Sequence, residues 1–330
     1  MTNEKAALVL GATGGIGGET ARALIAHGWA VRGLTRTARS GDGIDWIVGD
    51  ALDRAAVTRA ARGVSAIVHA VNPPGYRNWE KLVMPMLASS IAAAEAAGAR
   101  LALPGTIYNY DARRVARADE DAPQRPNTRK GAIRVEMERA IAEACARGMR
   151  GLIVRAGDFF GPRPGSSWLS QGLVTPGKPV RRILYPGKRG VGHAWAYLPD
   201  VAETFAQLLD RDAALPGFAR YHFRGVWDSD GSAIADAIRG AAGNPRLKTV
   251  GFPWGLLPLI APFNPTMREM IEMRAFWENP LELDNRALVS VLGAEPHTPL
   301  PAAMTATLAA LGCLPASDAS RGRVPAHAGA

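Results

Sequence analysis

Short apolar runs alternate with longer helical patterns through the first half of the chain. Six runs predict strands: AALVL, AVRGLT, IDWIV, SAIVHA, RLALP and GLIVR. Between them, segments such as 52–63 and 79–98 have the length and composition of helices, and each ends on a glycine. Strands that alternate with helices of this length indicate crossover units. We therefore predict an α/β fold: a Rossmann-type doubly wound parallel sheet, covered on both faces.

The pattern changes after about residue 155 into turns rich in glycine and proline. Further on, it predicts helices over 200–212, 230–243, 266–278 and 299–312 and a strand over 220–226. Prolines interrupt the stretch 252–265 too often for one helix. We predict a dinucleotide-binding domain over 1–157 and a disordered tail over 316–330. Between them, 158–315 is expected to be mostly a smaller C-terminal substrate-binding cap, with some elements returning to the sheet.

A glycine-rich turn joins the first predicted strand to the first predicted helix. In LVLGATGGIGGETARAL, three glycines have GxxGxxG spacing. Glycine permits the tight turn and lets the backbone approach a pyrophosphate, while the amides of the following helix bind its negative charge. A glycine turn without a ligand is the alternative, but the strand before it and the helix after it favour a dinucleotide site. The expected cofactor contacts are Gly11, Thr13, Gly14, Gly15, Ile16 and Gly17.

The end of the second predicted strand indicates which dinucleotide binds. NAD-binding folds normally carry an acidic residue here, which binds the ribose 2′-hydroxyl group, and GLTRTARS has none. Arg36, with Arg39 nearby, has the geometry to pair with a 2′-phosphate instead. The sequence therefore favours NADP over NAD as cofactor.

Composition and charge narrow the classes of partner. The net charge of +9 comes from 39 Lys and Arg against 30 Asp and Glu, and the cations are scattered along the chain rather than gathered in a stripe. We therefore expect no nucleic-acid partner. The longest apolar runs are too short for a membrane span, and Cys145 and Cys313 stand far apart without metal-ligand spacing. We expect a cytoplasmic protein without a metal, either a monomer or a homodimer, that binds a small aromatic or anionic substrate.

Several segments together resemble the short-chain dehydrogenases/reductases, in their extended, epimerase/dehydratase-like, and atypical branches. They are the glycine loop, VHAVNPP, LPGTIYNYD, RVEMERAI, LIVRAGDFFGP and YLPDVAETF. The resemblance implies that Asp50 reaches the adenine amino group, that Ala51 flanks the adenine ring and that Ala70 lines the cofactor site. A turn-forming role for Asp50 is the alternative.

The chain departs from this family at the residues that carry its chemistry. The family uses a serine, a tyrosine and, four residues later, a lysine, whereas this chain has Pro104, Lys130 and Arg134 at those positions. Lys130, Arg134 and Glu138 instead resemble the KxxxRxxxE segment of the isoflavone-reductase-like branch. That resemblance implies that Lys130 both contacts the cofactor and donates the proton, while Arg134 holds ribose hydroxyls or a substrate anion. The alternative is that both cations lie on a solvated helix face.

Other candidate groups follow the predicted strands. Thr106, Tyr108 and Tyr110 come after the fifth strand, where open sheets place ligands. Thr106 is a candidate hydrogen-bond donor to a carbonyl oxygen, and the two tyrosines are rival proton donors. His193 falls in a predicted loop, where a solvated or capping role is favoured over a catalytic one. The expected substrate pocket draws on Tyr76, Trp79, Asp158, Phe159, Phe160, His193 and Trp195.

The leading hypothesis is an NADP-dependent reductase of the atypical short-chain class, which moves hydride between NADP(H) and a small carbonyl or activated alkene. A cofactor-binding sensor without turnover is the second hypothesis, because the serine and the tyrosine are both missing. A sugar-nucleotide epimerase or dehydratase is the third.

Overall fold

The computed structural model describes residues 5–73, 79–165, 167–262 and 265–314. The predicted tail over 316–330 and the pocket candidate Tyr76 lie outside these residues.

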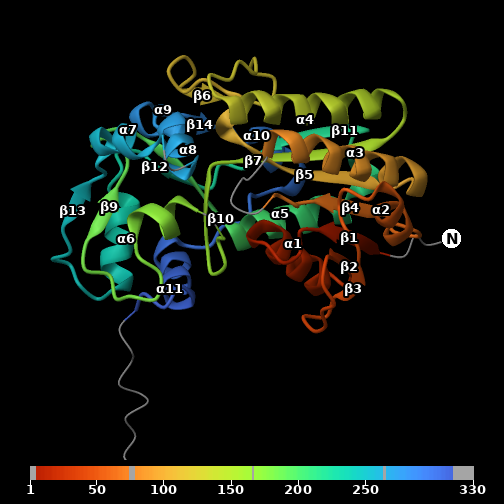
Figure 1. Ribbon diagram of the computed structural model, residues 1–330, viewed down its shortest axis with the longest axis horizontal. Helices are drawn as coiled ribbons and strands as arrows, with labels where there is room; N and C mark the ends of the chain where they lie inside the picture. Colours follow the sequence, from red (N-terminus) through yellow and green to blue (C-terminus); the bar gives the residue numbers. More distant parts are fainter. Residues whose placement is uncertain (1–4, 74–78, 166, 263–264, 315–330) are drawn as a thin grey trace, which may run out of the picture.

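An all-parallel seven-stranded sheet forms the centre of the molecule, with strand order β11-β7-β5-β4-β1-β2-β3 (Figure 1). The strands are β1 (Ala6–Leu10), β2 (Ala30–Thr35), β3 (Asp45–Val48), β4 (Ala66–His69), β5 (Arg100–Thr106), β7 (Arg150–Ala156) and β11 (Phe218–His222). Six of them are the strands that the apolar runs predict. The α/β fold with a doubly wound parallel sheet is therefore confirmed.

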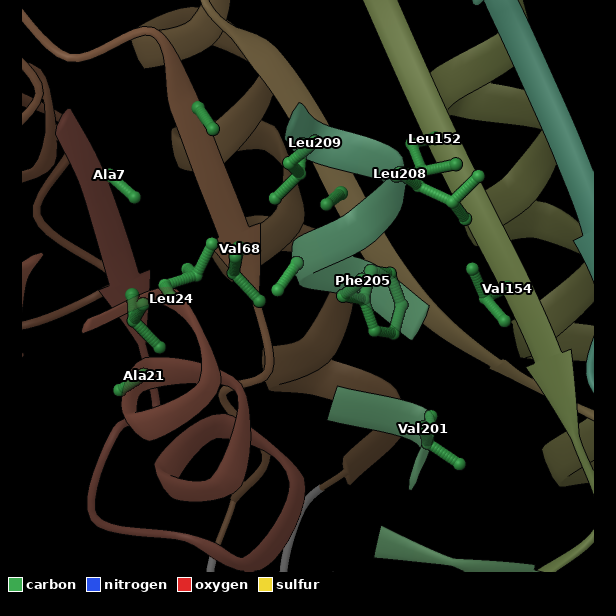
Figure 2. Close-up of a cluster of buried hydrophobic side chains, with 14 of the residues drawn as sticks. Ala7, Ala21, Leu24, Val68, Leu152, Val154, Val201, Phe205, Leu208 and Leu209 are labelled. Carbon is green, nitrogen blue, oxygen red and sulfur yellow. The ribbon is translucent and has the colours of Figure 1, made fainter. Parts of the chain in front are cut away.

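Helices cover both faces of this sheet. One face carries α2 (Arg54–Ala60), α3 (Trp79–Ala97) and α4 (Arg129–Ala146), and the other carries α1 (Gly15–Ala26), α5 (Leu198–Asp210) and α10 (Arg286–Leu292). Figure 2 shows Phe205 and Leu209 of α5 packed with Leu24 of α1 over Val68 of β4. All four side chains are almost fully shielded from solvent. The strands β1, β4, β5 and β7 are buried on both faces and therefore have no polar face, which explains why continuous apolar runs identified them.

The smaller elements gather beyond one end of the sheet (Figure 1). They are β8 (Asp158–Phe160), β9 (Ile183–Tyr185), β10 (His193–Tyr197), β12 (Val226–Asp228), β13 (Thr249–Gly251), α6 (Ala233–Ala241), α7 (Leu257–Ile260), α8 (Pro265–Met273), α9 (Ala275–Glu278) and α11 (Leu300–Ala310). Two further short strands, β6 (Arg117–Ala118) and β14 (Glu282–Leu283), pair with each other. The helix predicted over 266–278 is divided into α8 and α9. The strand predicted over 220–226 covers the end of β11 and the first residue of β12, with a break between them. Within the described residues, no helix is long and apolar enough to cross a membrane.

A histidine at the end of α1 connects this helix to α5. His27 Nδ1 lies 2.7 Å from Asp210 Oδ2, and its Nε2 lies 3.0 Å from Glu203 Oε1. The hydrogen bond to Asp210, together with Glu203, raises the pKa of His27 above its ordinary value near 6.5. The protonated ring therefore bridges two carboxylates.

This bridge predicts a pH-dependent contribution to stability. Because the pKa of His27 is raised in the folded state, its contribution is fully present below about pH 6.5 and is lost as pH rises through the folded-state pKa. We expect His27→Asn to lower the free energy of unfolding more at pH 6 than at pH 8.5, as measured by urea denaturation. His297→Asn, at an exposed histidine, serves as the matched control. An equal loss at both pH values would contradict the prediction.

Candidate active site

The glycine loop lies at the carboxyl end of β1 and leads directly into α1. Gly11 has a φ of 90°, and a Cβ atom there would lie 2.5 Å from the Ala70 carbonyl oxygen. At Gly17, a Cβ atom would lie 2.3 Å from the Gly11 carbonyl oxygen. These two glycines are therefore required by packing, and Ala70 forms one wall of the loop.

Gly14 differs from these two glycines. A Cβ atom there would meet only the Gly11 carbonyl oxygen, at 3.3 Å, and the residue is exposed. Gly14 is also the N-cap of α1, and no side chain caps the first turn of this helix. The amides of the first turn thus remain available to an anion, as a dinucleotide pyrophosphate requires.

The segment that follows β8 lies against this loop. A Cβ atom on Gly15 would come within 2.8 Å of the Arg163 carbonyl oxygen, and Arg163 Nη2 lies 3.2 Å from Glu19 Oε1. Glu19 is a buried residue of α1. The start of α1 is therefore covered on one side by residues that the sequence reasoning did not assign to the cofactor site.

The residues expected around the adenosine follow β2 and β3. Arg36 comes directly after β2 and is exposed, without an ion pair to any of the described residues. Arg39 differs from Arg36 in having partners. Its Nη2 lies 3.6 Å from Asp42 Oδ2, and its guanidinium group lies over the ring of Trp46. Asp50 accepts a hydrogen bond from the Leu52 amide at 2.9 Å, which is the turn-forming role that the sequence left open. Ala51 is buried beside it.

The first turn of α4 packs against the short helical turn η2 (Ile107–Asn109), which follows β5. Thr128 caps α4 by accepting a hydrogen bond from the Gly131 amide at 2.9 Å. Gly131 approaches Tyr108 so closely that a Cβ atom would lie 2.2 Å from the Tyr108 carbonyl oxygen. Lys130 is half-buried and directly precedes this contact. The lysine thus stands beside Tyr108, at the carboxyl edge of the sheet.

Arg134 lies one turn further along α4. Its guanidinium carbon is 5.5 Å from the centre of the Trp79 ring, at the start of α3. Burial, together with the charge of Arg134, lowers the pKa of His69 to about 3, and His69 ends β4. Arg134 therefore faces the carboxyl end of β4, next to Ala70.

Three polar side chains from three elements meet at the carboxyl edge of the sheet. The Tyr108 hydroxyl donates to Asp158 Oδ1 at 2.6 Å, and the other carboxylate oxygen of Asp158 lies 2.8 Å from His193 Nε2. Asp158 and His193 are buried, and Tyr108 is half-buried. Predicting His193 in a loop was wrong, because it is the first residue of β10. The five-residue strand HAWAY follows two glycines closely, which made its start resemble a turn.

A second buried network explains Tyr110 and Glu138. The Tyr110 hydroxyl accepts a hydrogen bond from Arg155 Nη1 at 2.7 Å, and Arg155 Nη2 lies 2.7 Å from Glu138 Oε2. Burial raises the pKa of Tyr110 to about 12, and its ring is fully shielded. Interpreting Tyr110 as a rival proton donor was therefore wrong. Glu138, like Tyr110, belongs to a buried hydrogen-bond network around Arg155.

The remaining candidates have structural contacts. The Thr106 hydroxyl accepts a hydrogen bond from the Tyr108 amide at 3.2 Å and so holds the turn that carries this tyrosine. Phe160 and Trp195 pack edge to face in a hydrophobic cluster and are fully buried, so they belong to the core rather than to a pocket surface. Phe159 is partly buried against the core between the sheet and α5. No group of histidine, cysteine and acidic side chains in the described ranges could hold a metal ion.

A glycine loop at the carboxyl edge of an all-parallel, doubly wound sheet defines the Rossmann-type class of dinucleotide-binding folds. Within this class, the chain belongs to the NAD dependent epimerase/dehydratase family, whose family model matches residues 7–221. No curated protein matches the chain significantly.

Solved structures of nucleotide-sugar enzymes share the fold at low sequence identity. A UDP-glucose 4-epimerase from Stenotrophomonas maltophila, with bound NAD and formylated UDP-arabinopyranose, has a TM-score of 0.72 and 16% identity, over 93% of this chain and 98% of that one. The UDP-glucose 4-epimerase from Bifidobacterium longum, in complex with NAD+ and UDP, has a TM-score of 0.70 and 13% identity, over 92% and 97%. The dTDP-glucose 4,6-dehydratase DesIV from Streptomyces venezuelae, with NAD bound, has a TM-score of 0.68 and 18% identity, over 92% and 96%.

Proposed function

We propose that the protein is an oxidoreductase that binds a nicotinamide dinucleotide on the glycine loop and transfers hydride at a carbon bearing a hydroxyl or carbonyl group. The observation that carries this proposal is the uncapped, exposed start of α1 at Gly14, on the same edge of the sheet as Lys130 and Tyr108. When bound, the cofactor supplies the hydride. The residues of this chain hold its pyrophosphate, orient the substrate and move the accompanying proton.

The division of roles follows from where the side chains lie. The amides of Gly15 and Ile16, at the start of α1, would hold the pyrophosphate. Ala70 would line the site beside the loop, because it already contacts Gly11. Lys130 and Arg134 share one face of α4 and would hold ribose hydroxyls or the substrate. Such cations stabilise a ligand that carries negative charge.

A nucleotide sugar is the substrate class that the relatives favour over a small carbonyl or an activated alkene. The family is that of the epimerases and dehydratases, and the similar structures are enzymes named for UDP-glucose and dTDP-glucose. A nucleotide sugar also carries the anionic phosphates that Lys130 and Arg134 would attract.

A cofactor-binding sensor without turnover is the second candidate. The observation that favours it is the replacement of the family's serine and tyrosine by Pro104 and Lys130. Pro104 has no side-chain donor and lies within β5, where it pairs with Val154. No hydroxyl group is available at that position to polarise a substrate carbonyl.

One set of assays separates the two candidates. The purified protein would be combined with NAD(H) or NADP(H) and with UDP-glucose, dTDP-glucose or the carbonyl probe 9,10-phenanthrenequinone. Nicotinamide absorbance reports net hydride transfer, and proton NMR of the sugar reports epimerisation or dehydration without net change of the cofactor. Conversion of any probe supports the oxidoreductase. Firm cofactor binding without conversion of these probes would favour the sensor.

The choice of cofactor gives a mutational prediction. We expect tighter binding of NADP(H) than of NAD(H), because Arg36 is exposed and residues 36–41, directly after β2, include no acidic residue. A charge-assisted hydrogen bond is worth about 1.5–3 kcal/mol, so Arg36→Ala should weaken NADP binding by about 10- to 100-fold and leave NAD binding unchanged. Titration of tryptophan fluorescence measures both affinities. Arg39→Ala is the matched control, because Arg39 is held by Asp42 and Trp46. Equal affinities for the two cofactors in the wild type would refute the preference.

A further inference from the structure

We propose that Tyr108 exchanges the proton with the substrate oxygen, and that the buried pair Asp158–His193 positions its hydroxyl and supplies the proton. This inference rests on the proposed hydride transfer and names the acid–base group of the same site. The family's tyrosine on α4 is absent from this chain. The structure provides a phenol from a different element, η2, directly beside the start of α4.

The sheet register explains why Tyr108 and Asp158 meet. Thr106 of β5 pairs with Ala156 of β7, and Tyr108 and Asp158 each stand two residues beyond this pair. Both side chains are therefore carried past the same edge of the sheet, where open α/β sheets bind their ligands. The hydroxyl–carboxylate distance of 2.6 Å is in the range of a charge-assisted hydrogen bond.

The register of a second sheet adds His193. Trp195 of β10 pairs with Asp158 of β8, and His193 stands two residues earlier on β10. Side chains two residues apart on a strand share one face, so His193 lies on the Asp158 side of β10. Three strands thus fix the positions of the three polar groups.

The surroundings of His193 favour its doubly protonated form. Its Nε2 faces the Asp158 carboxylate at 2.8 Å, and its Nδ1 faces the Phe276 carbonyl oxygen at 3.3 Å. Both neighbours are acceptors, so only a ring that carries both protons satisfies both. The indole of Trp277 stacks on the ring at 3.7 Å, with 9° between the planes, which is a favourable arrangement for a cation. In that form, Asp158 and His193 are a buried ion pair that carries one exchangeable proton.

Tyr108 connects this buried pair to the carboxyl edge of the sheet. Its ring is half-buried and packs edge to face against Phe276 at 5.1 Å, while its backbone contacts Gly131 beside Lys130. A cation near a phenol stabilises the phenolate form, a part that we assign to Lys130 because it directly precedes Gly131. The tyrosine–lysine combination of the family would thus be formed from two elements instead of one helix.

The proton balance of a reduction follows directly. Hydride adds to the carbonyl carbon, and the carbonyl oxygen takes the Tyr108 hydroxyl proton as the C–O double bond becomes single. The Asp158 carboxylate first takes the Nε2 proton of His193, and the carboxylic acid so formed gives a proton to the phenolate oxygen. His193 is left neutral and recovers its proton from solvent. Oxidation of an alcohol reverses each of these transfers.

The first part of the experiment compares three variants with the wild type, using NADPH with 9,10-phenanthrenequinone and NAD+ with UDP-glucose as probes. A lost general acid costs about 10²- to 10⁴-fold, so Tyr108→Phe should lower kcat by at least about 100-fold and leave cofactor affinity within about threefold. Lys130→Met should mainly weaken cofactor binding and keep more of kcat at saturating cofactor. Tyr185→Phe is the matched control, because the Tyr185 hydroxyl is buried and makes no hydrogen bond to any of the described residues.

The role of Asp158 and His193 in positioning Tyr108 is tested by a measurement that would stay unchanged if the two residues were only structural. In Asp158→Asn, the proton return to Tyr108 slows. We therefore expect the solvent deuterium isotope effect on kcat to increase while the KM for cofactor stays unchanged. His193→Gln should behave in the same way.

Three different results would each overturn all or part of the inference. A wild type that binds NADPH but converts neither probe would refute the proposed hydride transfer and this inference together. A wild type with turnover and a Tyr108→Phe variant of similar kcat would refute this inference alone, and a 100-fold loss in Lys130→Met would then assign the proton to Lys130. An unchanged isotope effect in Asp158→Asn would remove the relay and leave Tyr108 as an isolated acid.

Discussion

Gly14→Val is expected to abolish dinucleotide binding while leaving the fold intact. A Cβ atom at Gly14 would lie 3.3 Å from a single backbone atom, the Gly11 carbonyl oxygen, so the loop has to shift only slightly to take the side chain. The branched group would instead occupy the space next to the free amides of α1, where the pyrophosphate would lie. Loss of about two charge-assisted hydrogen bonds, each worth about 1.5–3 kcal/mol, corresponds to at least about a 100-fold loss of affinity. Calorimetric titration with NADPH and NADH measures this loss.

Two further glycine variants are compared with Gly14→Val. Gly17→Val should lower the thermal stability, because its Cβ atom would lie 2.3 Å from the Gly11 carbonyl oxygen. Gly240→Val, in an open position on α6, should leave cofactor affinity unchanged. Retained binding in a folded Gly14→Val protein would show that the glycine loop serves packing alone.

Arg155→Met is expected to destabilise the protein by about 3–5 kcal/mol, because it leaves the buried Glu138 carboxylate without its cation. Arg155 is fully shielded, and it holds Glu138 through Nη2 at 2.7 Å and through Nε at 3.0 Å. Burial and the charge of Arg155 lower the pKa of His222 to about 3, so this ring is neutral and its Nε2 accepts from Arg155 at 2.9 Å. Urea denaturation measures the loss.

The double variant tests the cause of this loss. In Arg155→Met/Glu138→Met both charges are removed, so much of the stability should return, and the two single losses should not add. Arg150→Met, at a half-buried arginine of the same strand, is the control for loss of a cation. Additive losses in the double variant would show that packing, rather than charge pairing, dominates this part of the core.

The sheet and the members of the polar site could be predicted from the sequence, whereas the contacts among these members could not. AALVL and GLIVR identify their strands because burial on both faces leaves a continuous apolar run. The glycine loop is equally local, since strand, turn and helix follow each other directly. The meeting of Tyr108, Asp158 and His193 depends on strand pairing across 85 residues, which no local pattern encodes. The family resemblance favours the helix that carries Lys130 and Arg134. The phenol of this site is Tyr108, which lies on the turn before that helix.

The segment at Arg163 has a thermodynamic consequence. Its carbonyl oxygen lies against Gly15 and its side chain pairs with Glu19, so the chain that leads into the C-terminal elements rests on the cofactor loop. A ligand that fixes this segment also fixes the start of α1. Coupling of this kind is reciprocal: the factor by which a bound dinucleotide raises the affinity for substrate equals the factor by which the substrate raises the affinity for the dinucleotide. The two halves of the protein would then act as one cooperative binding unit.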